Sequence, residues 1–239
     1  MSDPTPVDKS GSRVRRMFGE IAGRYDLLNR LLSLGIDRRW RRRTVGLVPP
    51  GEGPVLDVCT GTADLALAYC RVGGPHVRVV GADFCRPMLA IGRRKAGRLP
   101  PDRCLTLIEA DAERLPFADD AFGVVSVAFG LRNVSDTDRG LREMVRVCRP
   151  GGRVAVLEFA LPEARLLRTL YGWYFRRVLP VVGQGLARNR QAAYNYLPQS
   201  VDGFPQREAL AGRMERAGLS EVRFHSFTFG VALLYVGVK

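Results

Sequence analysis

Histidine and cysteine are scarce in this chain. Its 239 residues include two histidines and five cysteines, and no two cysteines form a C-x-x-C pair. The chain therefore lacks the ligand spacing of a zinc site. We expect no bound metal ion, and we expect the thiols to be reduced and mostly buried.

Long apolar runs are also missing. No stretch approaches the roughly 18 consecutive apolar residues of a membrane-spanning helix. Residues 1–11 are polar and contain proline, without the apolar core of a signal peptide. Hydrophobic residues still make up 46% of the chain, which is ordinary for a globular core. We expect a cytoplasmic protein with a disordered tail over residues 1–12 and a single domain over residues 13–239.

Acidic residues are outnumbered, and the imbalance is uneven along the chain. The net charge is +13. Residues 13–43 carry ten arginines against three acids, and residues 160–190 carry six arginines against one acid. Residues 44–159 are nearly neutral, with 15 basic and 14 acidic side chains. Such basic segments suit nucleic acid, an anionic membrane surface or an anionic substrate, and they equally suit solvated faces that bind nothing.

The nearly neutral middle alternates between short apolar runs and segments of helical periodicity. The pattern predicts strands over residues 55–59, 77–83, 105–108, 122–128 and 154–159, with helices over 64–72, 86–98 and 136–147 between them. Residues 149–152 are expected to stop the last of these helices. Strands separated by helices predict an α/β fold with a mostly parallel sheet covered on both faces.

The C-terminal part has a different pattern. A helix is predicted over residues 206–217, followed by strands over 222–229 and 231–238 that meet at Gly230. Two strands in direct succession indicate an antiparallel hairpin at one edge of the sheet. In parallel sheets of this kind a ligand binds beyond the carboxyl ends of the strands. Those ends are expected at Cys59, Asp83, Ala110 and Ala128.

The loop after the first strand carries the strongest motif. Gly61 is flanked by Thr60 and Thr62, and acids stand on either side at Asp57 and Asp64. Small residues let a ligand approach the backbone, but a dinucleotide site would have G-x-G-x-x-G here. Carboxylates at this place disfavour a pyrophosphate and favour a cationic ligand. We therefore predict contacts from Asp57 and Gly61 to such a ligand.

Acids also end the next two strands. Asp83 is placed to accept both hydroxyls of a ribose, and Asp111 to reach an adenine amino group beside the Ala112 N–H. Acids at three successive strand ends, without a phosphate cradle, describe a nucleoside that carries no phosphate. This chemistry predicts S-adenosyl-L-methionine as the cofactor. The alternative is that these acids only cap helices.

At this point the residues resemble a known family, the menaquinone and ubiquinone biosynthesis C-methyltransferases. The resemblance extends from about Val14 to Val238. The stretches that carry it are residues 25–29, 34–40, 115–117, 129–134, 149–153 and 196–201. It implies a class I methyltransferase fold with a seven-stranded sheet, and cofactor contacts at Thr62, Asp83, Asp111 and Ala112. The family's loop reads G-G-T-G-D; here Thr60 and Ala63 replace two glycines, so the loop should be stiffer.

The reaction implied by the resemblance is C-methylation of demethylmenaquinol to menaquinol. We expect Arg132 to point back over the cleft and hold a phenolate oxygen, with Asn133 beside it and Tyr25 closing over the ring. The alternatives are a salt bridge from Arg132 to Asp136 or Asp138, and simple packing of Tyr25 on the sheet.

The two basic segments receive a role from the same resemblance. A polyprenylated quinol lies in the bilayer, so we expect residues 13–46 to form a helical lid and residues 160–205 a helical insertion that faces an anionic membrane, without spanning it. Oligomeric state stays open, a homodimer included. The rival interpretations are a methyltransferase for another phenolic or quinol acceptor, a ubiquinone precursor included, an RNA methyltransferase, and a non-catalytic basic module that binds lipid or nucleic acid. The chain has no RNA-binding module or basic-aromatic RNP stretch, so we expect no nucleic-acid partner.

Overall fold

A seven-stranded sheet organises the chain. The computed structural model describes residues 10–33, 35–164, 169, 196 and 199–239. The strand order is β3-β2-β1-β4-β5-β7-β6. The strands are β1 (Val55–Val58), β2 (Arg78–Asp83), β3 (Cys104–Glu109), β4 (Phe122–Ala128), β5 (Cys148–Phe159), β6 (Ser220–Phe227) and β7 (Ala232–Val238). Strands β1 to β5 run parallel, and β7 lies antiparallel between β5 and β6.

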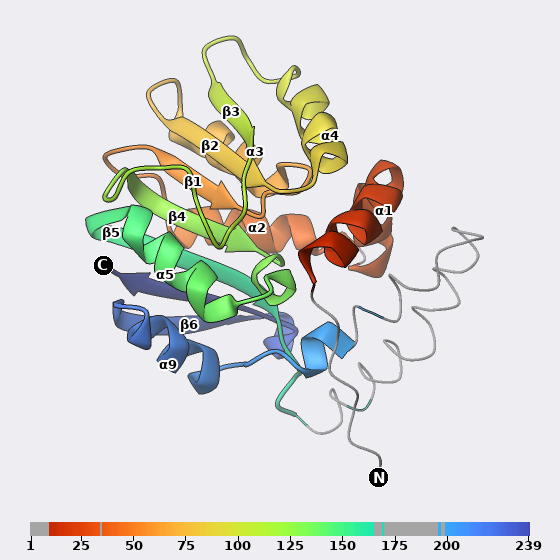
Figure 1. Cartoon of the computed structure of the whole chain (residues 1–239), viewed down its shortest axis with the longest axis vertical. Coiled ribbons are helices and arrows are strands. Elements are labelled where there is room, and N and C mark those ends of the chain that lie inside the picture. The colour runs from red at the N-terminus through yellow and green to blue at the C-terminus, as the bar shows by residue number, and fades with distance from the viewer. Residues whose placement is uncertain (1–9, 34, 165–168, 170–195, 197–198) are drawn as a thin grey trace.

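Helices cover both faces of the sheet (Figure 1). The helices are α1 (Gly11–Leu32), α2 (Asp37–Leu47), α3 (Asp64–Gly73), α4 (Arg86–Ala96), α5 (Thr137–Val147) and α9 (Glu208–Arg216), with short 3₁₀ turns η1 (Leu131–Asn133) and η3 (Thr228–Gly230). Helices α5 and α9 lie in front of the sheet in Figure 1, and α2 and α3 lie behind it. Helix α1 lies beside the carboxyl ends of the parallel strands and packs on α4.

Alternating side chains of the strands divide the core into two layers. In β5, Val154 and Val156 pack against α5 and α9, whereas Ala155 and Leu157 face α2 and α3. Strand β7 alternates in the same way. This period of two, with both sets buried, explains why the strand sequences are almost continuously apolar.

The sequence pattern located most elements correctly, and β4 matches its predicted bounds. The antiparallel C-terminal hairpin is also confirmed, with β6 as the outer strand and β7 inserted beside β5. One boundary is wrong: residues 149–152 do not separate helix from strand, because β5 already begins at Cys148. Cys148 pairs with Phe122 of β4, a bulge follows, and Gly151 donates to the Lys239 carbonyl at 2.8 Å.

The predicted insertion over residues 160–205 lies mostly outside the described residues, as does most of the tail predicted over residues 1–12. Helix α1 begins at Gly11, two residues before the predicted start of the domain. Among the described helices, none is both long enough and apolar enough to cross a bilayer.

Candidate active site

An open cleft of about 730 Å³ lies at the carboxyl ends of the parallel strands. Its walls include Cys59 after β1, Asp83 at the end of β2, Ala110 after β3 and Ala128 at the end of β4. These are the four strand ends at which the sequence predicted a ligand. Helix α1 supplies a further wall through Phe18 and Tyr25.

The loop after β1 is shaped from below by Asp57. One carboxylate oxygen of Asp57 accepts hydrogen bonds from the Thr60 hydroxyl at 2.6 Å and from the Ala66 N–H at 3.2 Å; the other accepts from the Ser126 hydroxyl at 3.2 Å. The Asp57 residue is 1% exposed and does not line the cleft. Burial raises its pKa to about 7, although these hydrogen bonds oppose the shift. Asp57 was predicted to contact the ligand, but it lies beneath the loop and holds the loop's shape.

Gly61 forms the part of this loop that faces the cleft. Its φ of +56° is left-handed, a conformation that glycine adopts without steric cost. Its N–H donates to Asp83 Oδ2 at 2.8 Å, and the Cys85 N–H donates to Asp83 Oδ1 at 2.8 Å. Both oxygens of Asp83 are thus fixed in the wall, and each has a further lone pair for a hydroxyl donor. Burial raises the pKa of Asp83.

The third strand end also faces the cleft. Asp111 and Ala112 line it together with Glu113, whose N–H donates to Asp111 Oδ1 at 2.9 Å. The structure therefore brings Gly61, Asp83, Asp111 and Ala112 into one cavity, as the sequence predicted for their positions.

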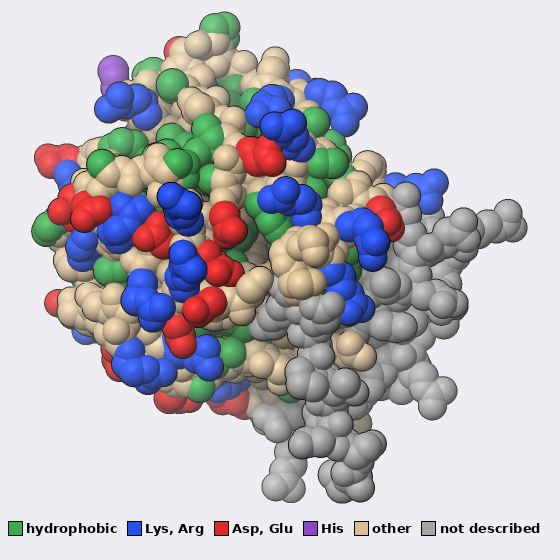
Figure 2. All heavy atoms as spheres, in the orientation of Figure 1, with side chains coloured by type: hydrophobic (Ala, Val, Ile, Leu, Met, Phe, Trp, Pro, Cys, Tyr) green, Lys and Arg blue, Asp and Glu red, His purple; other side chains and the backbone are tan. Residues whose placement is uncertain are grey.

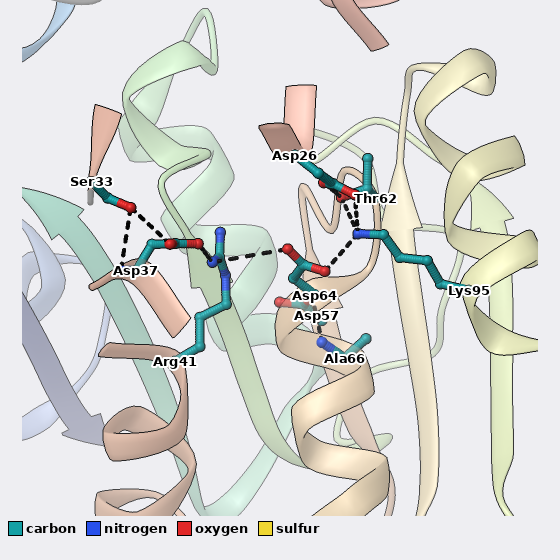
Figure 3. Close-up of polar contacts among 9 residues, drawn as sticks. All are labelled: Asp26, Ser33, Asp37, Arg41, Asp57, Thr62, Asp64, Ala66 and Lys95. Carbon is teal, nitrogen blue, oxygen red and sulfur yellow. Dashed lines mark hydrogen bonds and ion pairs between the residues drawn. The ribbon is translucent and has the colours of Figure 1, made fainter. Parts of the chain in front are cut away.

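Thr62 has a different environment from the one predicted. It does not line the cleft, and its hydroxyl donates to Asp26 Oδ1 of α1 at 2.6 Å (Figure 3). Lys95 of α4 donates to Thr62 Oγ1 at 2.9 Å and lies 2.6 Å from both Asp26 Oδ2 and Asp64 Oδ1. We call Asp26, Thr62, Asp64 and Lys95 the Lys95 cluster. It joins α1, α4 and the start of α3 just behind the cofactor loop, and no local sequence signal points to it.

The Lys95 cluster continues into α2. Arg41 pairs with Asp37 one turn earlier on the same helix and lies 4.0 Å from Asp64 Oδ2, while the Ser33 hydroxyl donates to Asp37 at 2.8 Å (Figure 3). Polar contacts thus run without a break from α2 to α4 across the N-terminus of α3.

Arg132 also departs from its prediction. The residue is 5% exposed, does not line the cleft, and pairs with Glu158 Oε2 at 3.0 Å. It donates to the Phe129 carbonyl as well. The predicted orientation back over the cleft is therefore wrong, because the buried carboxylate at the end of β5 holds the guanidinium. The alternative pairing with Asp136 or Asp138 is wrong too, since Asp136 caps α5 through the Arg139 N–H at 3.0 Å.

Asn133 and Tyr25 do face the cleft. Asn133 Nδ2 donates to the Phe129 carbonyl at 3.3 Å, whereas its Oδ1 is buried and has no hydrogen-bond partner. Tyr25 packs edge-on against Phe18, with ring centroids 6.0 Å apart, and hydrogen-bonds Asn29. Burial raises the pKa of Tyr25, so its hydroxyl stays protonated and can donate.

Two further residues shape the floor. A Cβ on Gly130 would lie 2.4 Å from Cys59 Cβ, so only glycine lets η1 approach the loop after β1 this closely. Burial raises the pKa of the Cys59 thiol well above its usual value, and the nearby carboxylates of Asp83 and Asp57 raise it further.

The charge of the cleft is one-sided. Among the described residues that line it, Asp83, Asp111 and Glu113 are acidic and none is Lys or Arg. Such walls favour a cation and repel a phosphate. The fixed carboxylate of Asp83 and the backbone exposed at Gly61 fit a cationic nucleoside, so the residues present suit S-adenosylmethionine.

Sheet order and the position of the cleft define the fold of the S-adenosylmethionine-dependent methyltransferases. The structure matches a SAM-dependent methyltransferase from Thermotoga maritima with a TM-score of 0.66 and 18% identity, covering 95% of this chain and 99% of that one. At this identity the likeness shows the fold alone.

Sequence comparison gives the family. The model of the ubiE/COQ5 methyltransferase family matches residues 7–239. The demethylmenaquinone methyltransferase of Thermus thermophilus is 51% identical over 92% of this chain and 99% of its own length. The ubiquinone/menaquinone biosynthesis C-methyltransferase UbiE of Geobacter sulfurreducens is 48% identical over 98% of this chain and 91% of its own length. The chain belongs to the ubiE/COQ5 methyltransferase family.

Proposed function

We propose that this protein methylates a ring carbon of a polyprenylated demethylmenaquinol, with S-adenosylmethionine as the methyl donor. The observation that carries the proposal is the acidic cleft at the strand ends, closed by Tyr25 and Asn133, in a chain whose relatives are named for quinone methylation. In this proposal the methyl acceptor lies against Tyr25 of α1 and Asn133 of η1, which both line the cleft.

Binding the donor is the first task of the cleft. When bound, S-adenosylmethionine supplies the methyl group and an excellent leaving group. In this proposal Asp83 accepts the ribose hydroxyls, Asp111 and the Ala112 N–H bind the adenine edge, and Gly61 lets the backbone approach. Thr62, which the family resemblance assigns to the cofactor, acts through the loop, because its hydroxyl is bonded to Asp26 and Lys95.

Activating the acceptor is the second task. Loss of a proton from a quinol hydroxyl to water makes the adjacent ring carbon far more nucleophilic. After the methyl group is transferred, the hydrogen on that carbon leaves as a proton and the oxygen is reprotonated, so the ring is a quinol again and one proton is released overall. Tyr25, kept protonated by burial, donates to the developing phenolate, and Asn133 orients the second quinol oxygen through its unpartnered Oδ1. Alignment of carbon, methyl and sulfur is worth about 7–11 kcal/mol in well-oriented systems.

In this proposal Arg132 does not contact the quinol ring and acts through its neighbours. Its pairing with Glu158 and its bond to the Phe129 carbonyl fix the backbone that also holds the Asn133 amide. In this role Arg132 is a positioning residue, and its positive charge also favours a phenolate near Tyr25.

A bilayer substrate requires access to the membrane. We place the protein in the cytoplasm and peripherally on an anionic membrane surface, with α1, α2 and the segment over residues 160–205 facing the lipid. The basic character of residues 13–43 and 160–190 supports this placement.

The test is a methyl-transfer assay on the purified protein with reduced quinols. We expect the protein to convert demethylmenaquinol to menaquinol, and to transfer the methyl group much more slowly to simple phenols. A benzoquinol acceptor belongs in the same panel, because the relatives' names include ubiquinone biosynthesis. Failure of demethylmenaquinone to accumulate in a strain that lacks the gene would refute the assignment.

A further inference from the structure

A second hollow borders α1 through Asp26 and Arg30, which do not line the cleft. It is an open groove with about 1,760 Å³ of empty space, bordered by α2, α3, α4 and the C-terminal part of α1. Six exposed arginines line it: Arg30, Arg38, Arg42, Arg71, Arg94 and Arg98. Within the described part of the chain, none of these six has an ion-pair partner. We call this hollow the arginine groove.

The acids in the groove do not balance these charges. Asp26 and Asp64 line it, but both pair with Lys95 at 2.6 Å, and Asp64 also lies near Arg41. The two carboxylates are therefore matched by Lys95 and Arg41, and the six arginines remain uncompensated. Like charges held around one hollow repel one another, and an anion in the groove relieves that repulsion.

Folding brings this charge together. Arg30, Arg38 and Arg42 come from the basic N-terminal segment, whereas Arg71, Arg94 and Arg98 come from the middle of the chain that is nearly neutral by count. The face over α5 and α9 is different, since Lys and Arg side chains intermingle there with Asp and Glu (Figure 2). The arginine groove therefore differs in charge from the face over α5 and α9.

The lining of the groove indicates the kind of anion. Guanidinium groups bind phosphate oxygens in a bidentate manner. The remaining described lining residues are aliphatic or proline, Leu67, Ala68, Ile91, Leu99 and Pro100, and no aromatic side chain is among them. Single-stranded nucleic acid is usually held by stacking of bases on aromatic rings, which the described lining does not offer. An arginine rim over an aliphatic floor fits an amphiphile with a phosphate head.

We propose that the arginine groove binds the phosphate headgroup of an anionic phospholipid. The groove is separate from the methyl-transfer cleft, so headgroup binding itself does not depend on the quinol. Its use, holding the enzyme at the bilayer with the cleft accessible to a lipid substrate, rests on the proposed function.

The experiment compares two triple variants of the full chain that remove the same charge. The groove variant is Arg71→Gln, Arg94→Gln and Arg98→Gln. The matched control is Arg142→Gln, Arg153→Gln and Arg216→Gln, three exposed arginines outside the groove. Flotation uses vesicles of phosphatidylcholine alone or with phosphatidylglycerol, without quinol or S-adenosylmethionine. We expect the groove variant to bind anionic vesicles at least tenfold more weakly than the unchanged protein, and the control to stay within about twofold, each juxtamembrane base contributing severalfold.

Further arms identify the source of the phosphate. Glycerophosphoglycerol should compete with vesicles at millimolar concentration, whereas inorganic phosphate at equal ionic strength should compete less. An equal loss of binding to anionic vesicles in the groove variant and the control would show nonspecific attraction and overturn the proposal. Loss of binding to an RNA oligonucleotide but not to vesicles would overturn it in favour of nucleic acid. Equal thermal melting and equal turnover of a short-tailed, water-soluble quinol in both variants separate this site from the methyl-transfer reaction.

Discussion

The cleft and the arginine groove are lined by different residues of α1 and have opposite charge. Neighbouring residues of this helix serve the two: Tyr25 lines the cleft, and Asp26 lines the groove. The described walls of the cleft contain three acids and no base, whereas the groove contains eight bases and two acids. A near-neutral stretch of sequence contributes to both, so linear charge counting cannot separate them. The opposite charges suit the two proposed ligands, a cationic nucleoside in the cleft and an anionic lipid headgroup in the groove.

The sharpest test of the comparison concerns Arg132, a buried base that does not line the cleft. We expect Arg132→Ala to lower the free energy of unfolding by about 3–5 kcal/mol, because Glu158 is left buried without a partner. Chemical denaturation measures this loss. The double variant Arg132→Met with Glu158→Gln should recover much of it. A stable Arg132→Ala protein with a specific loss of turnover would instead place the guanidinium in the cleft.

Asp57 tests the acid beneath the cofactor loop. Burial raises its pKa to about 7, so the folded protein keeps a proton that the unfolded chain loses near pH 4. Stability should therefore fall as pH rises between about 4 and 7, by about 4 kcal/mol from this group. Asp57→Asn removes the titration. Melting curves from pH 5 to 8 should show a slope for the unchanged protein that the variant lacks; parallel curves would contradict the assignment.

Asp83→Ala tests the acidic wall itself. We expect S-adenosylmethionine binding to weaken by about 1.5–3 kcal/mol, the usual worth of hydrogen bonds to a charged group. Calorimetry measures the change, with Asp83→Asn as the milder variant. Vesicle binding should stay the same, because Asp83 lines the cleft and not the groove. Unchanged cofactor affinity would remove Asp83 from the ribose site.

The Lys95 cluster gives the smallest expected effect. Lys95→Met should cost about 1 kcal/mol of stability, since the cluster is partly exposed. Because the cluster ties α1 to the cofactor loop, we expect the KM for S-adenosylmethionine to rise severalfold while kcat changes little. Lys95→Arg, which keeps the charge, should preserve most of the affinity. An effect on kcat alone would show that the cluster does not position the loop.

Local sequence patterns predicted the strands of the sheet and the strand-end residues of the cleft. They did not predict the contacts with distant residues that hold these elements in place. Short apolar runs and the turn residues beside them identify β4 and the acids at the strand ends, because both signals lie within a few residues. The early start of β5 depends on pairing with Phe122 and Lys239, which are distant in sequence.

The same limit explains the site residues that were misplaced. Thr62 was expected to contact the cofactor, but its hydroxyl is hydrogen-bonded to Asp26 of α1 and Lys95 of α4. The sequence predicts that Arg132 holds a phenolate oxygen, but in the structure Glu158 of β5 pairs with its guanidinium. The sequence around Thr62 and Arg132 does not indicate these partners, because each partner lies on another element whose position depends on the whole fold.

The protonation of Cys59 has a consequence for the durability of the enzyme. A sulfonium methyl donor alkylates thiolates readily, and Cys59 lies in the wall of the cleft that would hold it. Burial and the surrounding carboxylates keep this sulfur as a thiol at neutral pH. The acids that favour the cationic donor thus also protect the protein from methylating itself, so that each donor molecule remains available for the acceptor ring.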